Sequence, residues 1–396
     1  MAERFSRDVC VIGGGGRVGL PLALMFADAG LRTVIFDVNQ PKVEQIRSGR
    51  MPFLEEGADA LLTRTLAAGT LEVEYTPRNM DQCKFLVLII GTPIDEHLNP
   101  TFSSIQKSIE QCEPHLRPGQ IIILRSTIFP GISRHVQDYL DSRGHKVHVA
   151  FCPERVAQGH SLREFRELPQ IISACDPDAL AEVRKLFSRF TAELVEMEPM
   201  EAELCKLMTN AWRYIQFATV NQFYMIATKN DLDFNRILHG CRYKYPRMAS
   251  MPGPGFAAGP CLVKDAMQLA AFSQNNFVLG HAAMLINEGL PAHLIELAKR
   301  EVDLRSCTAG ILGMAFKADS DDPRDSLSYK LRKLLRLEAK RVVCSDPLVP
   351  GDDFIARDQL LAEADVIFVG TPHSEYRGLK APEGKLVVDV WNVLRR

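Results

Sequence analysis

Long apolar runs, a strong net charge and a secretory leader are all missing from this sequence. No run of apolar residues reaches the roughly 18 that a membrane-spanning helix needs, so we expect no membrane partner. Lys and Arg number 47 against 49 Asp and Glu, for a formal net charge of −2, so no excess of one sign indicates a nucleic-acid partner. The N-terminal stretch MAERFSRDVCVIG is charged and lacks the apolar core of a signal peptide. These absences predict a cytoplasmic protein.

Closely spaced cysteine pairs are also lacking. The ten cysteines are scattered singly, and none belongs to a CxxC or CxxH pattern. In a chain of 396 residues this distribution argues against a disulfide framework and against a zinc site, and it suits reduced thiols in a cytoplasm. We therefore expect no metal, and we expect most of the cysteines to be small buried apolar residues.

Short apolar segments alternate with amphipathic ones at both ends of the chain, which predicts parallel, doubly wound sheets. The first round of expected strands reads DVCVIGG, RTVIFDV, KFLVLIIGTP, QIIILRST and HKVHVAFCP, and the second reads TAGILGMAF, AKRVVCSDP, DVIFVGTP and KLVVDVWN. Residues 200–300 are mostly helix-patterned, apart from the Gly/Pro-rich stretch 246–260. We therefore predict two Rossmann-like, doubly wound α/β domains, at 1–199 and 301–396, joined by a central helical domain with a long helix.

A glycine-rich turn follows the first expected strand, in VIGGGGRVGLPLA. Gly14, Gly16 and Gly19 have the G-x-G-x-x-G spacing, with Gly13 as an extra glycine before them. This spacing lets the chain turn tightly and lets backbone amides approach a pyrophosphate, which then faces a helix N-terminus. Asp37 ends the second expected strand, where a carboxylate can bond the ribose hydroxyls and would repel a 2′-phosphate. The sequence therefore predicts a site for NAD rather than NADP; the alternative is a tight turn with no ligand.

Hydroxyl residues follow two further expected strands. Thr92 lies in the GTP that ends one strand, and Ser126 and Thr127 end the next. Ligands of doubly wound sheets bind beyond the carboxyl ends of strands, so these hydroxyls are candidate cofactor contacts. Each could equally serve as a capping hydroxyl. The second α/β domain has no equivalent glycine pattern, so we expect a single dinucleotide site.

One cysteine, Cys261, stands apart in the stretch GPGFAAGPCLVKD. Small residues and prolines precede it, and the amphipathic run LVKDAMQLAAF follows it. Pro260 suits the first turn of a helix, because its missing N–H would be unpaired there. Cys261 would then lie at a helix N-terminus, where partial positive charge favours the thiolate. Asp265 follows four residues later on the same face, so a thiol and a carboxylate would be neighbours.

Three polar residues in the first two domains could take part in chemistry, although each has a simpler interpretation. Glu154 follows an expected strand in CPERVAQG, where a lone Glu is usually a solvated loop residue. Lys206 and Asn210 are four apart on the helix expected at 201–223 and share a face. On spacing alone they would be surface residues.

Two cations follow a strand of the second α/β domain. Lys317 and Arg324 lie in the turn-rich loop FKADSDDPR, at the end of the sheet where ligands bind. Two cations in such a place suit a phosphate. Together with the thiol, these candidates supply carboxylate, ammonium, amide and guanidinium groups, which is the inventory of an active site.

In these motifs the chain resembles the nucleotide-sugar 6-dehydrogenases, the UDP-glucose and GDP-mannose dehydrogenase family. The matching segments are GGGGRVGLPLA, Asp37, GTP, RSTIFPG, CPERVAQG, AELCKLMTNA, GPGFAAGPCLVKD and GMAFKADSDDPRDS. The resemblance covers essentially the whole chain. It implies an NAD-binding domain at 1–199, a central domain at 200–300 with a long dimer-forming helix and the catalytic cysteine loop, and a UDP-sugar-binding domain at 301–396. It therefore implies a homodimer.

The family's reaction would account for the thiol, because it oxidises the C6 alcohol of a sugar to a carboxylate and passes two hydrides to two NAD⁺. By resemblance, the Cys261 thiolate would capture the intermediate aldehyde as a thiohemiacetal, a second hydride transfer would give a thioester, and water would release the acid. Lys206 would stabilise negative charge on the C6 oxygen with help from Asn210. Asp265 and Glu154 would position or activate water and move protons.

The resemblance also implies contacts with the two ligands. The implied NAD contacts are Gly14, Gly16, Val18, Gly19, Asp37, Lys42, Thr92, Thr127 and Arg324. The implied substrate contacts are Arg155, Phe256 and Lys317. Two departures from the family pattern concern these regions. The loop before the cysteine is one residue longer than usual and has Ala257 and Ala258 where glycine is expected, and Arg17 replaces a common aromatic residue in the glycine turn. Neither departure removes a chemical group, so we expect an active enzyme.

Three short motifs bear on which sugar is oxidised. PER after the fifth expected strand and PGPG before the cysteine loop resemble the UDP-N-acetylhexosamine branch, which acts on UDP-GlcNAc or UDP-ManNAc. KD after the cysteine is more like the UDP-glucose branch. We therefore predict a UDP-N-acetylhexosamine 6-dehydrogenase, with UDP-glucose 6-dehydrogenase as the alternative and GDP-mannose dehydrogenase third.

Two further classes are disfavoured. A nucleotide-sugar-binding relative without turnover would not require a thiol at position 261 or the polar groups that accompany it. A dehydrogenase of small β-hydroxy acids shares the N-terminal pattern, but it needs neither the cysteine nor a second α/β domain.

Overall fold

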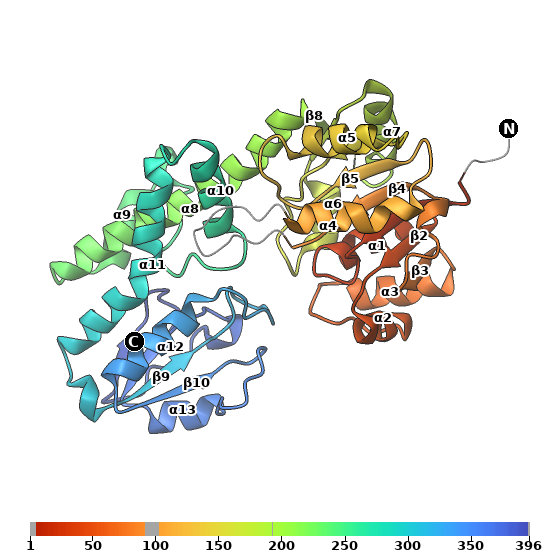
Figure 1. Cartoon of the computed structure of the whole chain (residues 1–396). Helices are drawn as coiled ribbons and strands as arrows, with labels where there is room; N and C mark the ends of the chain where they lie inside the picture. Colours follow the sequence, from red (N-terminus) through yellow and green to blue (C-terminus); the bar gives the residue numbers. More distant parts are fainter. Residues whose placement is uncertain (1–4, 92–102, 192, 395–396) are drawn as a thin grey trace. The chain divides into compact units, whose positions relative to one another are not determined.

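The computed structural model describes residues 5–91, 103–191 and 193–394 of the chain. Helices and strands alternate along much of it (Figure 1). Two separate β-sheets with flanking helices confirm the predicted α/β class, as does a long helix between them. Within the described residues, we find no helix that is both long enough and apolar enough to cross a membrane.

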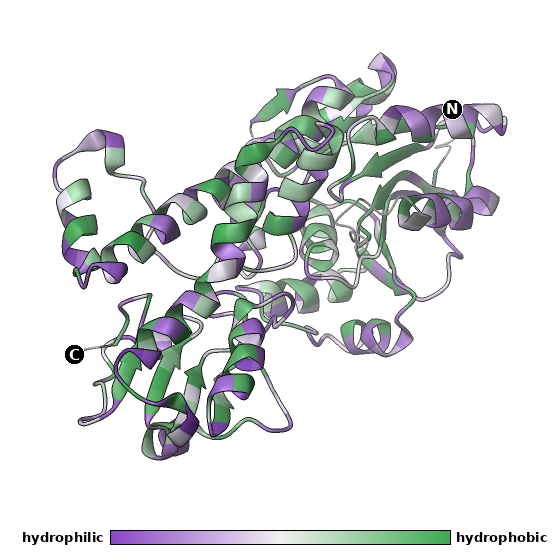
Figure 2. Ribbon diagram, turned by 60° about the vertical axis from the view of Figure 1, so that its left-hand side comes forward, coloured by the Kyte–Doolittle hydropathy of each residue, from purple (hydrophilic) through white to green (hydrophobic). Residues whose placement is uncertain are grey.

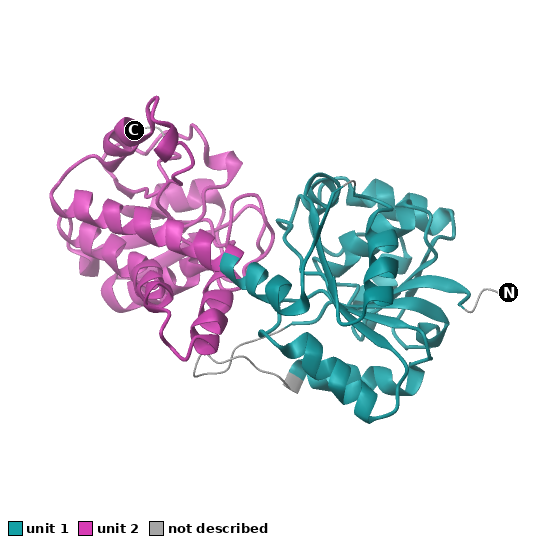
Figure 3. Ribbon diagram, turned by 90° about the horizontal axis from the view of Figure 1, so that it is seen from above, with its two compact units in different colours: residues 1–208 teal, residues 209–396 magenta. Residues whose placement is uncertain are grey.

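The chain divides into two compact units (Figure 3). Unit 1 comprises residues 1–208, and unit 2 comprises residues 209–396. The boundary falls inside the long helix α8 (Pro199–Lys229). Our predicted division into three domains stays a prediction, because the helices that follow α8 and the second sheet belong to one compact unit.

Unit 1 is built on an eight-stranded sheet with the order β3-β2-β1-β4-β5-β6-β7-β8. Its strands are β1 (Arg7–Ile12), β2 (Thr33–Phe36), β3 (Leu71–Glu74), β4 (Cys83–Leu88), β5 (Ile121–Leu124), β6 (His148–Phe151), β7 (Gln170–Ala174) and β8 (Leu194–Glu196). From β1 the chain builds the sheet outward to β2 and β3, and it then returns to add β4 on the other side. The strand order therefore reverses between β1 and β4, which is where doubly wound sheets bind ligands.

The first sheet is mixed, whereas the sequence predicted a parallel one. β7 runs antiparallel to β6, with Ala150 opposite Ala174, and β8 is parallel to β7. The apolar segment QIISA of β7 looks like a parallel strand, because the direction of a strand is set by the path of the connection before it and not by its own residues. The strands β3, β7 and β8 were also absent from the expected set.

Helices flank the sheet of unit 1, whose strands are mostly hydrophobic (Figure 2). The apolar side chains between sheet and helices form two buried clusters. The helices are α1 (Gly19–Asp28), α2 (Gln40–Arg47), α3 (Ala58–Ala67), α4 (Ser103–Cys112), α5 (Ile132–Ser142), α6 (Ser161–Glu167) and α7 (Pro177–Phe187). The rings of Phe26, Phe165, Phe187 and Phe190 pack edge to face, with centroids 5.5 to 6.2 Å apart. Such pairs stabilise a core beyond the area that they bury.

Unit 2 joins a helical layer to a second sheet of order β10-β9-β11-β12, in which the neighbouring strands are all parallel. Its elements after α8 are α9 (Phe234–Arg242), α10 (Leu262–Phe272), α11 (Val278–Lys299), β9 (Thr308–Leu312), α12 (Leu327–Glu338), β10 (Arg341–Ser345), α13 (Arg357–Glu363), β11 (Val366–Val369) and β12 (Leu386–Val388). Helix α8 has 31 residues and extends past both ends of the predicted helix 201–223. The four strands expected at the C-terminus are all present.

Candidate functional site

The glycine-rich turn joins β1 to α1 in unit 1. Gly13 has a φ of +75°, and a Cβ there would lie 2.0 Å from the carbonyl oxygen of Ile89, so no larger residue fits. Gly19 begins α1, and a Cβ on it would lie 2.6 Å from the Gly13 carbonyl oxygen. The turn therefore holds the helix N-terminus close to the end of β1, with Val18 as the N-cap residue.

Asp37 follows β2 and lies against this turn. Its carboxylate accepts hydrogen bonds of 2.9 Å from the backbone N–H of Gly15 and of Asn39. Lys42, in α2, lies on the same side, because a Cβ on Gly15 would come within 3.0 Å of its Cδ. A glycine cradle, a helix N-terminus and a carboxylate at the next strand end are what a dinucleotide's pyrophosphate and ribose require. These residues fit NAD.

The strand ends beside the turn differ in what their hydroxyls do. Ser126 Oγ donates to the Ile90 carbonyl oxygen at 2.7 Å and accepts from the Ile90 N–H at 2.8 Å, so this hydroxyl bridges the ends of β4 and β5. Thr127 comes next and is half-buried. The predicted contact Thr92 lies outside the described residues.

Glu154 is not a solvated loop residue. Its Oε2 accepts hydrogen bonds from Arg125 Nε at 3.1 Å and Nη2 at 2.7 Å, and its Oε1 accepts from the N–H groups of Arg155 and Val156. Arg125 itself is fully buried, and its guanidinium lies 5.1 Å from the ring centroid of Phe187. Sequence reasoning missed Arg125, although a charged residue directly after the apolar run QIIIL was a signal that could have found it.

Two further predicted site residues of unit 1 are Arg155, in the loop after β6, and Lys206, on α8. The Arg155 guanidinium donates to the carbonyl oxygen of Pro169. Lys206, on α8, is only 9% exposed, so it is not the surface residue that its spacing alone would suggest. One turn earlier, buried Glu203 accepts hydrogen bonds from the N–H groups of Gly131 and Ser133 at the start of α5. This contact fixes the first turns of α8 to the sheet.

In unit 2, Cys261 is the N-cap residue of α10 and is the one cysteine of the ten that is exposed. Helix α10 begins at Leu262, so Pro260 precedes the cap and does not occupy the first helical turn, as the sequence analysis had expected. The Asp265 N–H donates to the Cys261 carbonyl oxygen at 2.9 Å, which is the first bond of the helix. The thiol therefore lies at the positive end of the helix dipole.

Asp265 is completely buried beneath this helix start. Its Oδ2 accepts a 2.6 Å hydrogen bond from Asn210 Nδ2, and its Oδ1 lies 2.8 Å from Lys264 Nζ. Asn210 comes from α8 and is only 4% exposed. The structure thus brings together an amide, a carboxylate and an ammonium group next to the residue that bears the thiol. Sequence reasoning used Lys264 only as a clue to the substrate and missed its contact with Asp265.

The cysteine loop, residues 255–261, also contacts the segment after β9. The Gly259 N–H donates to the Asp325 carbonyl oxygen at 3.1 Å, and a Cβ on Gly259 would lie 2.6 Å from the Phe316 ring. Lys317 follows Phe316, with its Nζ 6.0 Å from the centroid of that ring. The cations predicted at 317 and 324 therefore belong to a segment that touches the cysteine loop.

Arg324 pairs with Asp322 at 2.6 Å. The hydrogen bonds that Arg324 donates to Asp322 raise the pKa of the Arg324 guanidinium, burial opposes this increase, and the negative charge of Asp322 adds to it. Phe256, a predicted substrate contact, is buried and packs edge to face on Trp391 at 6.5 Å.

Asp346, directly after β10, holds the segment before Lys317 in place through hydrogen bonds. Its carboxylate accepts backbone hydrogen bonds of 2.6 to 2.9 Å from Met314, Ala315, Leu348 and Val349. It also lies 3.1 Å from His373 Nε2. His373 Nδ1 accepts from the Asp319 N–H, so Nε2 carries the proton. Burial raises the pKa of Asp346, but these hydrogen bonds, with His373 foremost, outweigh burial and leave the pKa below its usual value.

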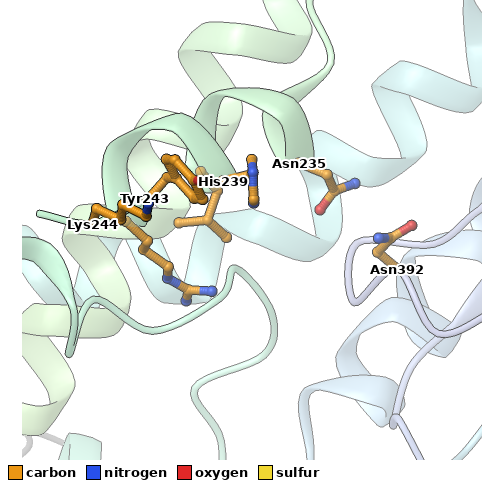
Figure 4. Close-up of a pocket in the computed structure, with 7 residues that line it drawn as sticks. Asn235, His239, Tyr243, Lys244 and Asn392 are labelled. Atoms are coloured by element: carbon orange, nitrogen blue, oxygen red, sulfur yellow. The ribbon is translucent and has the colours of Figure 1, made fainter.

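A pocket of about 460 Å³ lies elsewhere in unit 2, between α9 and the loop that carries Asn392 (Figure 4). It is lined by Asn235, Leu238, His239, Arg242, Tyr243, Lys244 and Asn392. None of the predicted site residues that the structure describes lines it. Its basic side chains lie in the last turn of α9 or just after it, where positive charge complements the helix dipole without any ligand.

The arrangement matches one family along nearly all of its length. Models of three domains of the UDP-glucose/GDP-mannose dehydrogenase family match this chain: the NAD binding domain at residues 7–191, the central domain at 200–289 and the UDP binding domain at 310–396. A UDP-N-acetyl-D-mannosamine dehydrogenase of Methanocaldococcus jannaschii is 28% identical over 408 residues, which cover 98% of this chain and 93% of that protein.

Two solved structures are also similar. The UDP-D-ManNAc dehydrogenase of Pyrococcus horikoshii has a TM-score of 0.91 at 26% identity, covering 98% of this chain and 96% of that one. A UDP-glucose dehydrogenase of Pyrobaculum islandicum has a TM-score of 0.89, also at 26% identity, covering 99% and 96%.

Proposed function

The chain belongs to the UDP-glucose/GDP-mannose dehydrogenase family and is an NAD-dependent nucleotide-sugar 6-dehydrogenase, and we propose that its substrate is a UDP-N-acetylhexosamine, either UDP-ManNAc or UDP-GlcNAc. The UDP binding domain implies a UDP-sugar. The assignment of an acetamido sugar as the substrate rests on the similarity, over nearly the whole chain, to UDP-N-acetyl-D-mannosamine dehydrogenases. The PER and PGPG motifs support the same branch.

We propose Cys261 as the nucleophile, because it is exposed and caps α10, where the helix dipole favours the thiolate. NAD⁺, when bound, supplies the acceptor for a hydride in each of two oxidations. After the first oxidation the C6 aldehyde carbon forms a bond to the Cys261 sulfur, which gives a thiohemiacetal. Loss of a second hydride and the hydroxyl proton gives a thioester, and water cleaves the C–S bond to release the uronic acid and the thiol.

The polar residues near these steps receive roles that fit their surroundings. Lys206 would stabilise negative charge on the C6 oxygen, and Asn210, already a donor to Asp265, would help to hold that oxygen or a water. Asp265 would position or activate the hydrolytic water. The four hydrogen bonds that Glu154 already accepts favour a positioning role in water binding over proton abstraction.

The remaining predicted contacts divide between the two ligands. For NAD we propose the glycine turn (Gly14, Gly16, Val18, Gly19), Asp37, Lys42, Thr92, Thr127 and Arg324. For the UDP-sugar we propose Arg155, Phe256 and Lys317. Lys317 suits the diphosphate, since it follows the carboxyl end of β9, where parallel sheets bind anionic ligands.

The substrate assignment is tested by NADH formation with UDP-ManNAc, UDP-GlcNAc, UDP-glucose and GDP-mannose under identical conditions. A kcat/KM highest for one of the two acetamido sugars is the expected result. A preference for UDP-glucose would overturn the substrate assignment and leave the family mechanism intact. UDP-glucose is the second candidate because the Pyrobaculum islandicum UDP-glucose dehydrogenase is similar over the whole chain.

We propose that a second copy of the chain covers the apolar residues that α8 and α11 expose. Trp212 and Ile226 on α8, and Val278, Leu279 and Leu285 on α11, are 55% to 72% exposed. Large side chains exposed in such numbers are typical of interaction surfaces. Light scattering should give at least twice the chain mass of 44.3 kDa, and Trp212→Glu with Leu285→Glu should lower the measured mass toward that of the monomer. A wild-type mass near 44.3 kDa would contradict this proposal.

A further inference from the structure

The peptide unit of Gly255, at the start of the cysteine loop, is held by one buried side chain. Asn221 Oδ1 accepts a 2.9 Å hydrogen bond from the Gly255 N–H, and Asn221 Nδ2 donates a 2.9 Å bond to the Gly255 carbonyl oxygen. Because the Gly255 N–H can only donate, the atom that faces it must be the amide oxygen, which fixes the orientation of Asn221. The side chain thus pairs with this residue as a neighbouring β-strand would.

A second buried amide holds the first one in place. Asn221 Nδ2 gives its other proton to Asn287 Oδ1 at 2.9 Å, and Asn287 Nδ2 donates to the Tyr214 carbonyl oxygen at 3.1 Å. Asn221 and Asn287 are both fully buried and come from α8 and α11. Three of the four amide protons of this pair are donated in these bonds, and such pairing is how buried polar networks reduce the cost of burying polar groups. The loop is therefore tied to two long helices.

The backbone at Gly255 is also confined on the side that faces Trp391. Its φ of +150° is one that residues with side chains rarely adopt, and a Cβ would lie 2.2 Å from the indole ring of Trp391. Trp391 Nε1 in turn donates to the Gly370 carbonyl oxygen, so the ring is anchored. Gly255 lies between the Asn221 amide and this ring, one residue before Phe256 and six before Cys261.

We propose that Asn221 is a positioning residue of the reaction, which acts through Gly255 to place Phe256 and Cys261 for the nucleotide sugar. The loop is fastened at two points, at Gly255 by Asn221 and at Gly259 by the Asp325 carbonyl oxygen. If the hydrogen bonds from Asn221 to Gly255 are lost, the loop is held only by the Gly259–Asp325 hydrogen bond and can rotate about it. Phe256 then shifts, and the Cys261 thiol is no longer correctly placed relative to C6 of the sugar. This role rests on the proposed site for the nucleotide sugar, whichever UDP-sugar that is.

The test compares Asn221→Ala with Gln120→Ala. Gln120 is an equally buried amide of unit 1 that accepts from the Arg117 N–H and donates to the carbonyl oxygens of Met80 and Cys83, so its truncation removes the same kinds of bonds away from the loop. Both variants should lower the unfolding midpoint. Only Asn221→Ala should lower kcat/KM for the best nucleotide sugar, by about 10- to 100-fold, with the KM for NAD⁺ within about twofold of wild type.

Gly255→Ala tests the same Asn221–Gly255 contact by changing the loop instead of the helix. It replaces Asn221→Ala in the test if that variant does not fold. Its Cβ displaces the loop from Trp391 while both asparagines remain, so it should reproduce the loss in kcat/KM and the unchanged KM for NAD⁺. Gly253→Ala, where a Cβ meets nothing within 4 Å, should behave as wild type. Equal kinetic losses in Asn221→Ala and Gln120→Ala, or a Gly255→Ala enzyme with wild-type kcat/KM, would overturn the proposal. Because the sugar used is the one that wild type oxidises best, a wrong substrate assignment does not affect this test.

Discussion

Arg125 and Glu154 meet inside unit 1, where one guanidinium donates two hydrogen bonds to a single carboxylate oxygen, at 3.1 and 2.7 Å. The Arg125 side chain is fully buried, and the Glu154 side chain is 11% exposed. Each charge is stabilised mainly by the other, since bulk water solvates neither of them well. The pair also orients the loop that starts at Arg155, because the other Glu154 oxygen accepts two of the loop's N–H groups.

Glu154→Gln should therefore destabilise the protein by about 3–5 kcal/mol, because it leaves Arg125 buried without a counter-charge. Urea unfolding followed by circular dichroism measures the change. Glu196→Gln is the control, since Glu196 pairs with Arg184 with both side chains 40% or more exposed, and the unfolding midpoint should hardly move. A Glu154→Gln protein as stable as wild type would show that the buried pair contributes little.

Cys261→Ser and Cys261→Ala should abolish uronic acid formation and leave at most slow aldehyde chemistry. Both variants should still bind NAD⁺ and the UDP-sugar, because neither proposed ligand site depends on the sulfur. Product analysis by mass spectrometry and calorimetric titration with each ligand separate the two properties. Cys205→Ser, one residue before Lys206, is the control and should cost packing but spare the chemistry. Acid formed by Cys261→Ala at near the wild-type rate would refute the covalent mechanism.

Asp37 should make the enzyme prefer NAD⁺ to NADP⁺, because a 2′-phosphate would meet its carboxylate beside Gly15. Asp37→Ala should narrow this preference, mainly through a higher kcat/KM for NADP⁺. Initial rates with each cofactor at a saturating sugar concentration provide the ratio. Comparable turnover of the wild-type enzyme with both cofactors would contradict the assigned role of Asp37.

Asp346 should make the fold of unit 2 sensitive to acid. Its pKa is lowered in the folded protein from an ordinary value of 3.8, so its ionised form contributes stability that is fully present above about pH 4 and is lost as the pH falls below it. Thermal unfolding between pH 7 and pH 2 should show a steep decline for wild type and a shallower one for Asp346→Asn. Asp358→Asn, with an 82% exposed side chain, should keep the wild-type decline. Identical slopes for all three proteins would show that Asp346 does not govern the acid range.

The sequence could predict the elements that local pattern specifies. Apolar runs such as KFLVLII and QIIIL marked strands, and the polar residues after them marked the carboxyl ends where sites form. The position of Cys261 at a helix N-terminus also followed from the residues around it, although Pro260 was wrongly expected in the first turn. Each of these features depends on neighbours within a few positions, which periodicity and capping rules describe.

Contacts between distant segments could not be predicted in this way. Asn210 and Asp265 are 55 residues apart, and Asn221 and Gly255 are 34 apart. In sequence, each of these asparagines is one polar residue on a long helix, and only the packing of α8 shows that it is buried. The reversal of β7 belongs to the same group, because the connection before a strand sets its direction.

The distribution of the ten cysteines has a practical consequence. Four thiols have a raised pKa and a buried side chain, in the case of Cys112 and Cys152 at about 12, so they hardly ionise at neutral pH. Cys261 is the exposed one and is also the proposed nucleophile. Peroxide or a maleimide dye should consequently react first with the Cys261 thiol. One equivalent of reagent per chain should therefore both modify and inactivate the enzyme. Preparations stored without a reductant should lose turnover long before they lose their fold.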